Sequence, residues 1–133
     1  MTTASDILVI DDDAIMREAV AEWLEAAGYR IRTAGNGIAG LAAVNVAVPA
    51  LVVTDIHMPE ASGVMVIAEL KRHHPEIPIL AISGLFESGY GINAATAVAL
   101  GAARALAKPF NRGDLLAAVA ELLGPRASGS TGD

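Results

Sequence analysis

The sequence predicts an α/β fold in which helices cover both faces of a doubly wound, five-stranded parallel sheet. Five short apolar runs alternate with segments of helical spacing, in the order (βα)5, and this alternation is typical of parallel sheets. Some of the runs are apolar without a break, as expected for strands buried on both faces. With 133 residues, 53% of them hydrophobic, the chain is large enough for one domain with its own core.

The first strand is predicted at Ile7 to Ile10, an apolar run that ends in Asp11, Asp12 and Asp13. A helix follows, and Gly28 is placed to end it. Asp13 is expected to cap this helix, because a negative charge suits the positive end of the helix dipole. The helix is predicted from apolar residues at helical spacing, namely Met16, Val20, Trp23, Leu24 and Ala27.

The second strand is predicted over residues 29–34, where Arg30 and Arg32 interrupt the apolar pattern and favour a position near the sheet edge. A Gly-Asn-Gly turn is expected at residues 35–37. Residues 38–48 then read as a weak, Ala-rich helix that stops before Pro49.

The central strand is predicted at Leu51 to Asp55, a largely β-branched run that stops on a single carboxylate, and Pro59 fixes the loop that follows. In open parallel sheets the ligand crevice lies beyond the carboxyl ends of the strands, so Asp55 is expected at its rim. Taken alone, Asp55 is better explained as a cap of the next turn. The polar residues at the ends of the other strands instead favour a functional role for Asp55 in the ligand crevice.

The remaining chain repeats the pattern of strand and helix. A helix capped by Ser62 is expected to run out at His73 and His74, which are interpreted as surface residues at a helix end. An Ala-rich helix at about residues 93–100 is ended by Gly101. The other predicted elements are a strand at Ile79 to Ile82 ending in Ser83-Gly84, a strand at Arg104 to Ala107 closing on Lys108-Pro109, and a last helix that Asn111 and Asp114 cap.

Composition limits the classes of protein. There is no cysteine, which excludes disulfides and thiolate metal sites and fits the cytoplasm. A net charge of −6 argues against a nucleic-acid partner, and the apolar stretches are shorter than the ~20 residues of a membrane span. We expect a domain at residues 6–123, a short extension at residues 1–5, a disordered tail at residues 124–133, and a core of small side chains.

Polar side chains follow four of the predicted strands: Asp11 and Asp12, Asp55, Ser83 and Lys108. Carboxylates sharing one crevice repel each other, by about 4 kcal/mol per pair at ~4 Å and an effective dielectric near 20. Crowding is therefore expected to raise at least one carboxyl pKa. Mg²⁺ relieves the repulsion, because hard oxygen ligands favour it. A carboxylate beside Mg²⁺ can attack phosphorus, with Lys108 and Ser83 binding phosphoryl oxygens.

The order of these motifs resembles the receiver domains of two-component response regulators, similar in plan to the chemotaxis response regulator, over roughly residues 6–123. The motifs are Ile7 to Asp12, Asp55 to Pro59 with Gly63 following, Ile82 to Gly84, and Lys108 to Phe110.

The resemblance implies a flavodoxin-like fold and a stand-alone phosphoacceptor module rather than an enzyme. A phosphohistidine of a sensor histidine kinase or of a histidine phosphotransfer protein would supply the phosphoryl group, and a downstream protein target would read it. A cis peptide bond is implied between Lys108 and Pro109. The implied site residues are Asp55 for phosphorylation; Asp11, Asp12, Asp55 and the backbone carbonyl of His57 for Mg²⁺; Ser83 and Lys108 for phosphate binding and switching; and Asp55 and Lys108 for catalysis.

One position departs from the family. Receivers often carry Tyr or Phe three residues before the lysine, as a switch linked to the Ser/Thr, and here that residue is Ala105. We therefore expect phosphorylation to be read through reordering of residues 85–94, whose glycines constrain the backbone weakly. The side chain of His57 is expected to line the pocket rather than bind metal.

Two alternatives fit some of the same residues. A Mg²⁺-dependent phosphatase of the haloacid-dehalogenase type would use Asp11 and Asp13 as its Asp-x-Asp motif, although Ile15 stands where Thr or Val is expected and 133 residues leave no room for a cap insertion. A nucleotide- or flavin-binding protein would need a phosphate-cradling loop after the first strand, which the sequence lacks.

Overall fold

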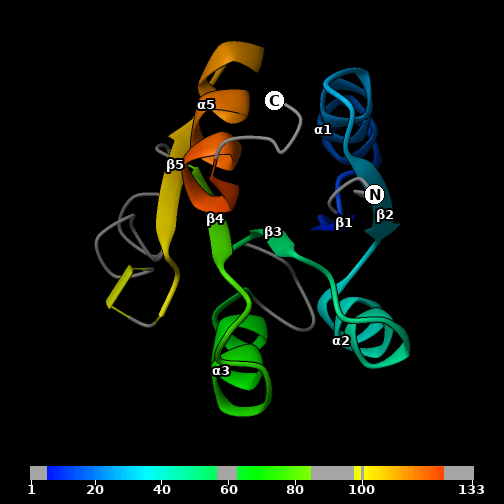
Figure 1. The fold of residues 1–133 in the computed structure, drawn as a ribbon, viewed down its shortest axis with the longest axis vertical. Helices are drawn as coiled ribbons and strands as arrows, with labels where there is room; N and C mark the ends of the chain where they lie inside the picture. Colours follow the sequence, from blue (N-terminus) through cyan, green and yellow to red (C-terminus); the bar gives the residue numbers. More distant parts are fainter. Residues whose placement is uncertain (1–5, 57–62, 85–97, 100, 125–133) are drawn as a thin grey trace.

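The computed structural model describes residues 6–56, 63–84, 98–99 and 101–124. Within these ranges the chain forms a five-stranded parallel sheet of strand order β2-β1-β3-β4-β5, with helices on both faces (Figure 1). The predicted doubly wound fold is confirmed. The strands are β1 (Asp6–Ile10), β2 (Arg30–Ala34), β3 (Leu51–Asp55), β4 (Ile79–Gly84) and β5 (Arg104–Lys108). The helices are α1 (Ala14–Ala26), α2 (Gly37–Val46), α3 (Gly63–His73) and α5 (Arg112–Leu123).

The two faces of the sheet bury two separate hydrophobic clusters. Successive strand residues point to opposite faces, so Leu8 and Ile10 of β1 join the core under α2 and α3. Ile7 and Val9 join the core under α1 and α5. Figure 1 shows these two helix pairs on opposite sides of the sheet. Burial on both faces explains why the central strands read as unbroken apolar runs.

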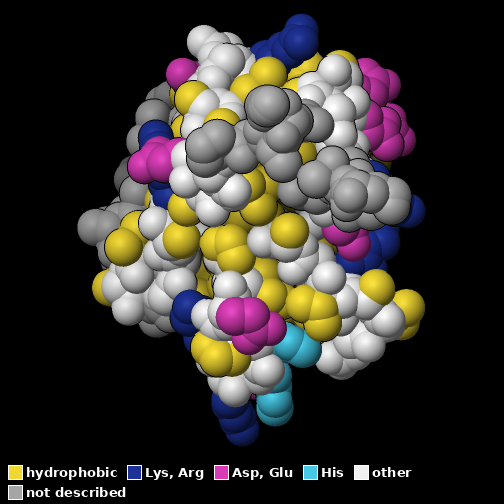
Figure 2. Space-filling model, viewed as in Figure 1, with side chains coloured by type: hydrophobic (Ala, Val, Ile, Leu, Met, Phe, Trp, Pro, Cys, Tyr) yellow, Lys and Arg dark blue, Asp and Glu magenta, His cyan; other side chains and the backbone are white. Residues whose placement is uncertain are grey.

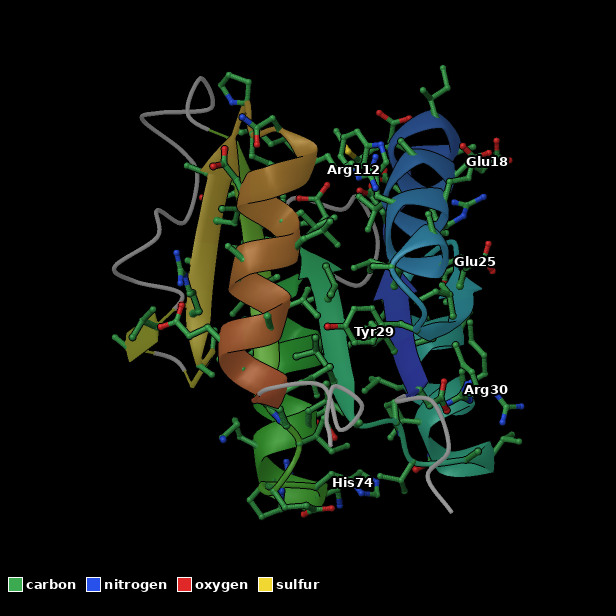
Figure 3. All side chains as sticks on the ribbon, turned by 45° about the horizontal axis from the view of Figure 1, so that its top comes forward. Glu18, Glu25, Tyr29, Arg30, His74 and Arg112 are labelled. Atoms are coloured by element: carbon green, nitrogen blue, oxygen red, sulfur yellow. The ribbon has the colours of Figure 1, made fainter. Side chains whose placement is uncertain are left out.

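Helix α1 begins and ends as predicted. The Asp13 carboxylate accepts a hydrogen bond from the N–H of Ile15 at 3.0 Å, and Gly28 follows the helix with a φ of 102°, which other residues rarely adopt. In Figure 3, Glu18 and Glu25 point away from the sheet. Glu18 and Glu25 therefore lie on the solvent face of α1, opposite the apolar residues that predict the helix.

Strand β2 lies at the sheet edge, as predicted, but the helix after it starts earlier than expected. Asn36 caps α2 by accepting a hydrogen bond from the N–H of Ala39 at 2.7 Å, so Gly37 is already helical and the predicted turn is shorter. The helix ends at Val46 instead of running to Val48. Asparagine is a strong N-cap, and this local hydrogen bond outweighs the turn propensity of the two glycines.

The prediction of a core built from small side chains is wrong. Only four alanines are among the buried hydrophobic residues of the described chain, whereas twelve large side chains, all Ile or Leu, are less than 2% exposed. The strands supply most of these large residues. Many alanines instead lie on the outer sides of helices, as Ala39 and Ala42 of α2 do, because alanine stabilises a helix without needing burial.

The connection from β5 to α5 is as predicted. The peptide bond between Lys108 and Pro109 is cis. Asn111 and Asp114 form a reciprocal capping box, with hydrogen bonds of 2.8 and 3.2 Å. An ion pair between Arg104 and Glu121 joins β5 to α5.

Several predicted features lie outside the described residues: the Ser62 cap, most of the helix at residues 93–100, the extension at residues 1–5 and the tail beyond Gly124. Residues 98 and 99 are helical, and the N–H of Gly101 bonds the carbonyl of Val98 at 3.0 Å. None of the helices in the described part of the chain is long and apolar enough to cross a membrane.

Candidate functional site

The strand register brings the predicted site residues to one edge of the sheet. Ile10 of β1 pairs with Thr54 of β3, so Asp11 and Asp55 occupy the next positions on neighbouring strands. Ser83 comes one residue beyond the β4 position that pairs with Asp55. The carboxyl ends of parallel strands meet at this edge, which is where such sheets bind ligands.

Three carboxylates form the centre of the site. Ligand oxygens of Asp11, Asp12 and Asp55 all lie within 4.8 Å of one another, and no other group of three or more potential ligands in the described ranges is so arranged. Asp11 and Asp55 are 3% and 4% exposed, whereas Asp12 is open to solvent. Two buried carboxylates and one exposed carboxylate give the cluster one side that solvent reaches.

Lys108 brings one positive charge to this cluster. Its Nζ lies 3.4 Å from Oδ2 of Asp55, and the lysine side chain is partly exposed. One ammonium against three carboxylates leaves an excess of negative charge. Because the donors are all hard oxygens, the cluster fits a hard divalent cation such as Mg²⁺.

Ser83 and Ala105 lie on the adjacent strands β4 and β5, and the β5 residue that pairs with Ser83 is Ala107, two positions beyond Ala105. Ser83 is 3% exposed. Ala105 pairs with Ala81 of β4 and packs against the core under α2 and α3. A methyl group cannot exchange space with a moving serine hydroxyl as an aromatic ring can, so Ala105 provides no side-chain switch.

Burial raises the pKa of Asp11 from its ordinary value of 3.8 to about 6. The Asp13 N–H, which donates to Oδ1 of Asp11 at 2.9 Å, opposes this rise, as does Lys108, whereas the charges of Asp55 and Asp12 add to it. The predicted direction of the pKa change is therefore confirmed for one carboxyl group. The predicted cause is wrong in part, because burial outweighs crowding.

The raised pKa predicts how stability changes with pH in the absence of divalent cations. The folded protein holds the Asp11 proton more tightly than the unfolded chain does, so the contribution of Asp11 to the free energy of unfolding falls as pH rises from about 4 to 6. The loss is on the order of 3 kcal/mol above pH 6. Urea unfolding of the parent and of Asp11→Asn isolates this contribution: the stability advantage of the variant should grow from pH 4 to 7, and a constant difference would contradict the prediction.

Two contacts of the site escaped prediction from sequence. The guanidinium of Arg17 in α1 donates to the backbone carbonyl of Asp11 at 2.8 Å. The buried hydroxyl of Thr54 donates to the carbonyl of Asp55 at 3.1 Å. Arg17 lies four residues after the cap Asp13, which is the spacing that returns a side chain to the start of its helix, so a local signal for the first contact existed.

His57 and residues 85–94 lie outside the described residues. The carbonyl ligand, the pocket-lining side chain and the reordering segment predicted there remain predictions.

Comparison with known proteins identifies the family. Residues 7–120 match the response regulator receiver domain. The chain belongs to this family. Receiver domains are signalling modules of two-component response regulators, they typically bind Mg²⁺ at an acidic pocket, and they interact with sensor histidine kinases. The acidic cluster at the strand ends has the composition of that pocket.

Individual relatives agree with this receiver assignment. The chain is 31% identical over 126 residues to a CpxR homolog, a transcriptional regulatory protein of Haemophilus influenzae, covering 95% of this chain and 53% of the relative. It is similar in structure to the receiver domain of NtrX from Brucella abortus, with a TM-score of 0.81, 35% identity and coverage of 89% and 98% of the two chains. The chemotaxis protein CheY4 of Vibrio cholerae matches with a TM-score of 0.79, 26% identity and coverage of 91% and 100%.

The chain spans about half or less of the length of the first curated relatives it matches. The phosphatase alternative is not supported. The family match assigns the chain elsewhere, and Asp13, the second aspartate of the supposed Asp-x-Asp motif, caps α1.

Proposed function

We propose that Asp55 is the phosphoacceptor of this receiver and that residues 6–123 form the receiver domain. The observation that carries the proposal is the position of Asp55. It is 4% exposed, belongs to the only cluster of three carboxylates in the described chain, and has Lys108 Nζ at 3.4 Å. The domain assists its own phosphorylation and dephosphorylation and acts on no separate substrate.

In the proposed step a carboxylate oxygen of Asp55 attacks the phosphorus of a phosphohistidine. A P–O bond forms as the P–N bond to the imidazole breaks, and the ring nitrogen keeps the electron pair and takes up a proton. The products are an acyl phosphate on Asp55 and a neutral histidine on the donor protein.

Asp11, Asp12, Asp55 and the backbone carbonyl of His57 are the proposed Mg²⁺ ligands. Bound Mg²⁺ supplies positive charge against the carboxylates and the phosphoryl oxygens. Two hydrogen bonds within the chain hold Asp11 in position for this role. The Asp13 N–H holds one oxygen of Asp11, and the Arg17 guanidinium holds the carbonyl of the same residue.

Lys108 and Ser83 are the proposed phosphate-binding residues. Lys108 already contacts the carboxylate of Asp55, so a small movement would carry its ammonium to a phosphoryl oxygen once Asp55 is phosphorylated. The Ser83 hydroxyl, on the adjacent strand, would donate to a second oxygen. Charge-assisted hydrogen bonds of this kind are stronger than neutral ones and develop with the transferring charge.

The proposed phosphodonor is a cytoplasmic sensor histidine kinase or a histidine phosphotransfer protein, and the proposed readout is a change in affinity for a downstream protein. Transcriptional regulators are among the relatives, but a net charge of −6 favours a protein over nucleic acid as the target of this chain.

Intact-mass measurement tests the acceptor chemistry. After incubation with acetyl phosphate and Mg²⁺, the protein should gain one phosphoryl group, and hydroxylamine should remove it, because acyl phosphates are attacked by this nucleophile. A gain that forms equally well in EDTA, or that resists hydroxylamine, would contradict a carboxylate acceptor with a Mg²⁺ site.

Mg²⁺ affinity should fall as pH falls below about 6. A proton on Asp11, whose pKa is raised to about 6, competes directly with the cation, so affinity should drop by roughly tenfold per pH unit when one proton is displaced. Titration of Mg²⁺ between pH 4 and 8, followed by calorimetry, measures this. An affinity that does not change with pH would exclude Asp11 as a ligand.

The readout of phosphorylation should appear in residues 85–94. The methyl group of Ala105 cannot follow a movement of Ser83. We therefore expect the conformational change on phosphorylation to occur in the backbone after β4. Amide hydrogen exchange with and without beryllium fluoride, a phosphoryl mimic, should show altered protection across residues 85–94. Changes confined to β5 around Ala105 would contradict this route.

A further inference from the structure

Arg17 differs from the other charged residues of α1. It is the one basic residue of this helix, and its neighbours Glu18, Glu22 and Glu25 are exposed. Figure 2 shows acidic side chains along the outer side of α1. Arg17 is half-buried, and it forms an ion pair with none of the residues that the structure describes. Its guanidinium instead binds a backbone group of the acidic site.

The guanidinium of Arg17 lies between two loops at the carboxyl ends of the strands. Its Nη1 donates to the carbonyl of Asp11 at 2.8 Å, in a partly buried hydrogen bond. The same Nη1 would lie 3.5 Å from a Cβ added to Gly35, so it is also beside the turn that follows β2. Hydrogen bonds from an ionised donor are stronger than neutral ones. The contact therefore fixes the peptide group between Asp11 and Asp12.

Asp11 is also held by contacts that do not involve Arg17. Its N–H donates to the carbonyl of Ala34 in β2 at 3.1 Å, and its carboxylate accepts from the N–H of Asp13 at 2.9 Å. The residue is buried among the elements that surround it. Both the backbone and the side chain of Asp11 would therefore keep a partner if Arg17 were removed.

Asp12 depends more strongly on Arg17. Its side chain is exposed, and no hydrogen bond or ion pair joins it to another residue in the described ranges. A carboxylate oxygen of Asp12 nevertheless lies within 4.8 Å of ligand oxygens of Asp11 and Asp55. The carbonyl that Arg17 binds belongs to the peptide bond leading into Asp12. Rotation of this peptide group would redirect the Cα–Cβ bond of Asp12 and move its carboxylate away from the cluster.

We propose that Arg17 is a positioning residue for Asp12 and raises the Mg²⁺ affinity of the acidic site through the backbone rather than through its charge. The inference rests on the proposed Mg²⁺ site of this receiver. Charge and position predict opposite effects. A positive charge near three carboxylates repels a cation, so loss of the charge alone would tighten Mg²⁺ binding. Loss of a group that orients a metal ligand weakens binding.

Calorimetric titration of the full chain with Mg²⁺ separates these two effects. At about pH 8 Asp11 is ionised, since its pKa is about 6. Arg17→Met keeps an unbranched side chain but removes the donor and the charge, and its Mg²⁺ affinity should be about tenfold lower than that of the parent. Arg30→Met is the matched control. Arg30 is exposed at the first residue of β2, at the opposite end of the sheet (Figure 3), so this variant should bind Mg²⁺ as the parent does.

A double-mutant cycle tests whether Arg17 acts through Asp12. Asp12→Ala removes the exposed ligand and leaves Asp11 and Asp55 for residual binding. In this background Arg17→Met should change the Mg²⁺ affinity by less than about twofold, because the carboxylate that Arg17 positions is gone. A tenfold loss in both backgrounds would overturn the proposal, and so would a Mg²⁺ affinity of Arg17→Met equal to or above that of the parent.

Phosphoryl uptake from acetyl phosphate gives a second readout. Arg17→Met should need about tenfold more Mg²⁺ for half-maximal uptake but reach the parent rate at saturating Mg²⁺, because Asp55 and Lys108 are unchanged. A lower rate at every Mg²⁺ concentration would indicate general damage to the site and contradict the positioning role. A parent that binds Mg²⁺ but gains no phosphoryl group would contradict the proposed acceptor, whereas parent-like Mg²⁺ binding by Arg17→Met would refute only the role of Arg17.

Discussion

Asp55→Asn is expected to abolish phosphoryl uptake while leaving the fold intact. The substitution removes the nucleophilic oxygen but keeps the shape of a side chain that is 4% exposed. It also removes one of three crowded negative charges, so the free energy of unfolding without Mg²⁺ should be no lower than that of the parent. Intact mass after incubation with acetyl phosphate and Mg²⁺ measures the first effect, and urea unfolding measures the second.

Asp13→Asn is the matched control for this substitution. It makes the same chemical change two residues from Asp11, and asparagine caps a helix about as well as aspartate. Its carboxylate accepts from the first turn of α1 and takes no part in the proposed transfer. The control should gain a phosphoryl group at the parent rate. Uptake by Asp55→Asn at the parent rate would place the acceptor elsewhere.

Gly63→Ala is expected to cause the largest loss of stability. A Cβ at this position would lie 2.4 Å from the carbonyl oxygen of Asp55 and 2.5 Å from Cα of Ile56. Both are backbone atoms, so no side-chain rotation relieves the overlap, and β3 or the start of α3 must move. We expect a loss of about 3 kcal/mol in the free energy of unfolding. Phosphorylation should also slow, because the displaced strand end carries Asp55, the proposed acceptor.

Gly35→Ala is the control for Gly63→Ala. Its nearest contact would be Nη1 of Arg17 at 3.5 Å, an ordinary van der Waals distance to a flexible side chain. Its stability should therefore stay within about 0.5 kcal/mol of the parent. Equal stabilities of the two variants in urea or thermal unfolding would show that the approach of Gly63 to β3 is not a constraint.

The strand that ends on Asp55 and the residues that cap the helices could be predicted from sequence because their signals are local, whereas the proposed roles of Asp55 and Lys108 depended on the polar residues at the other strand ends. An apolar run that stops on Asp55 and the Asn111–Asp114 capping box are each contained in a few residues. These local signals identify the residues but do not predict how far each side chain is buried. Asp11 and Asp12 read as equivalent ligands, yet one is 3% exposed and the other is open to solvent, since burial depends on the elements that pack above each position.

By itself the sequence determined the alternation of strands and helices, the parallel sheet, and the polar residues at the ends of four strands, because hydrophobic period and turn chemistry act between near neighbours. Only the tertiary structure decided which contacts join distant segments. It brought Asp11, Asp12 and Asp55 within 4.8 Å, pressed Gly63 against the backbone of β3, and turned His74 into a groove beside α2. Each of these contacts depends on how the helices pack on the sheet. That packing involves side chains from the whole chain, so a short stretch of sequence cannot predict it.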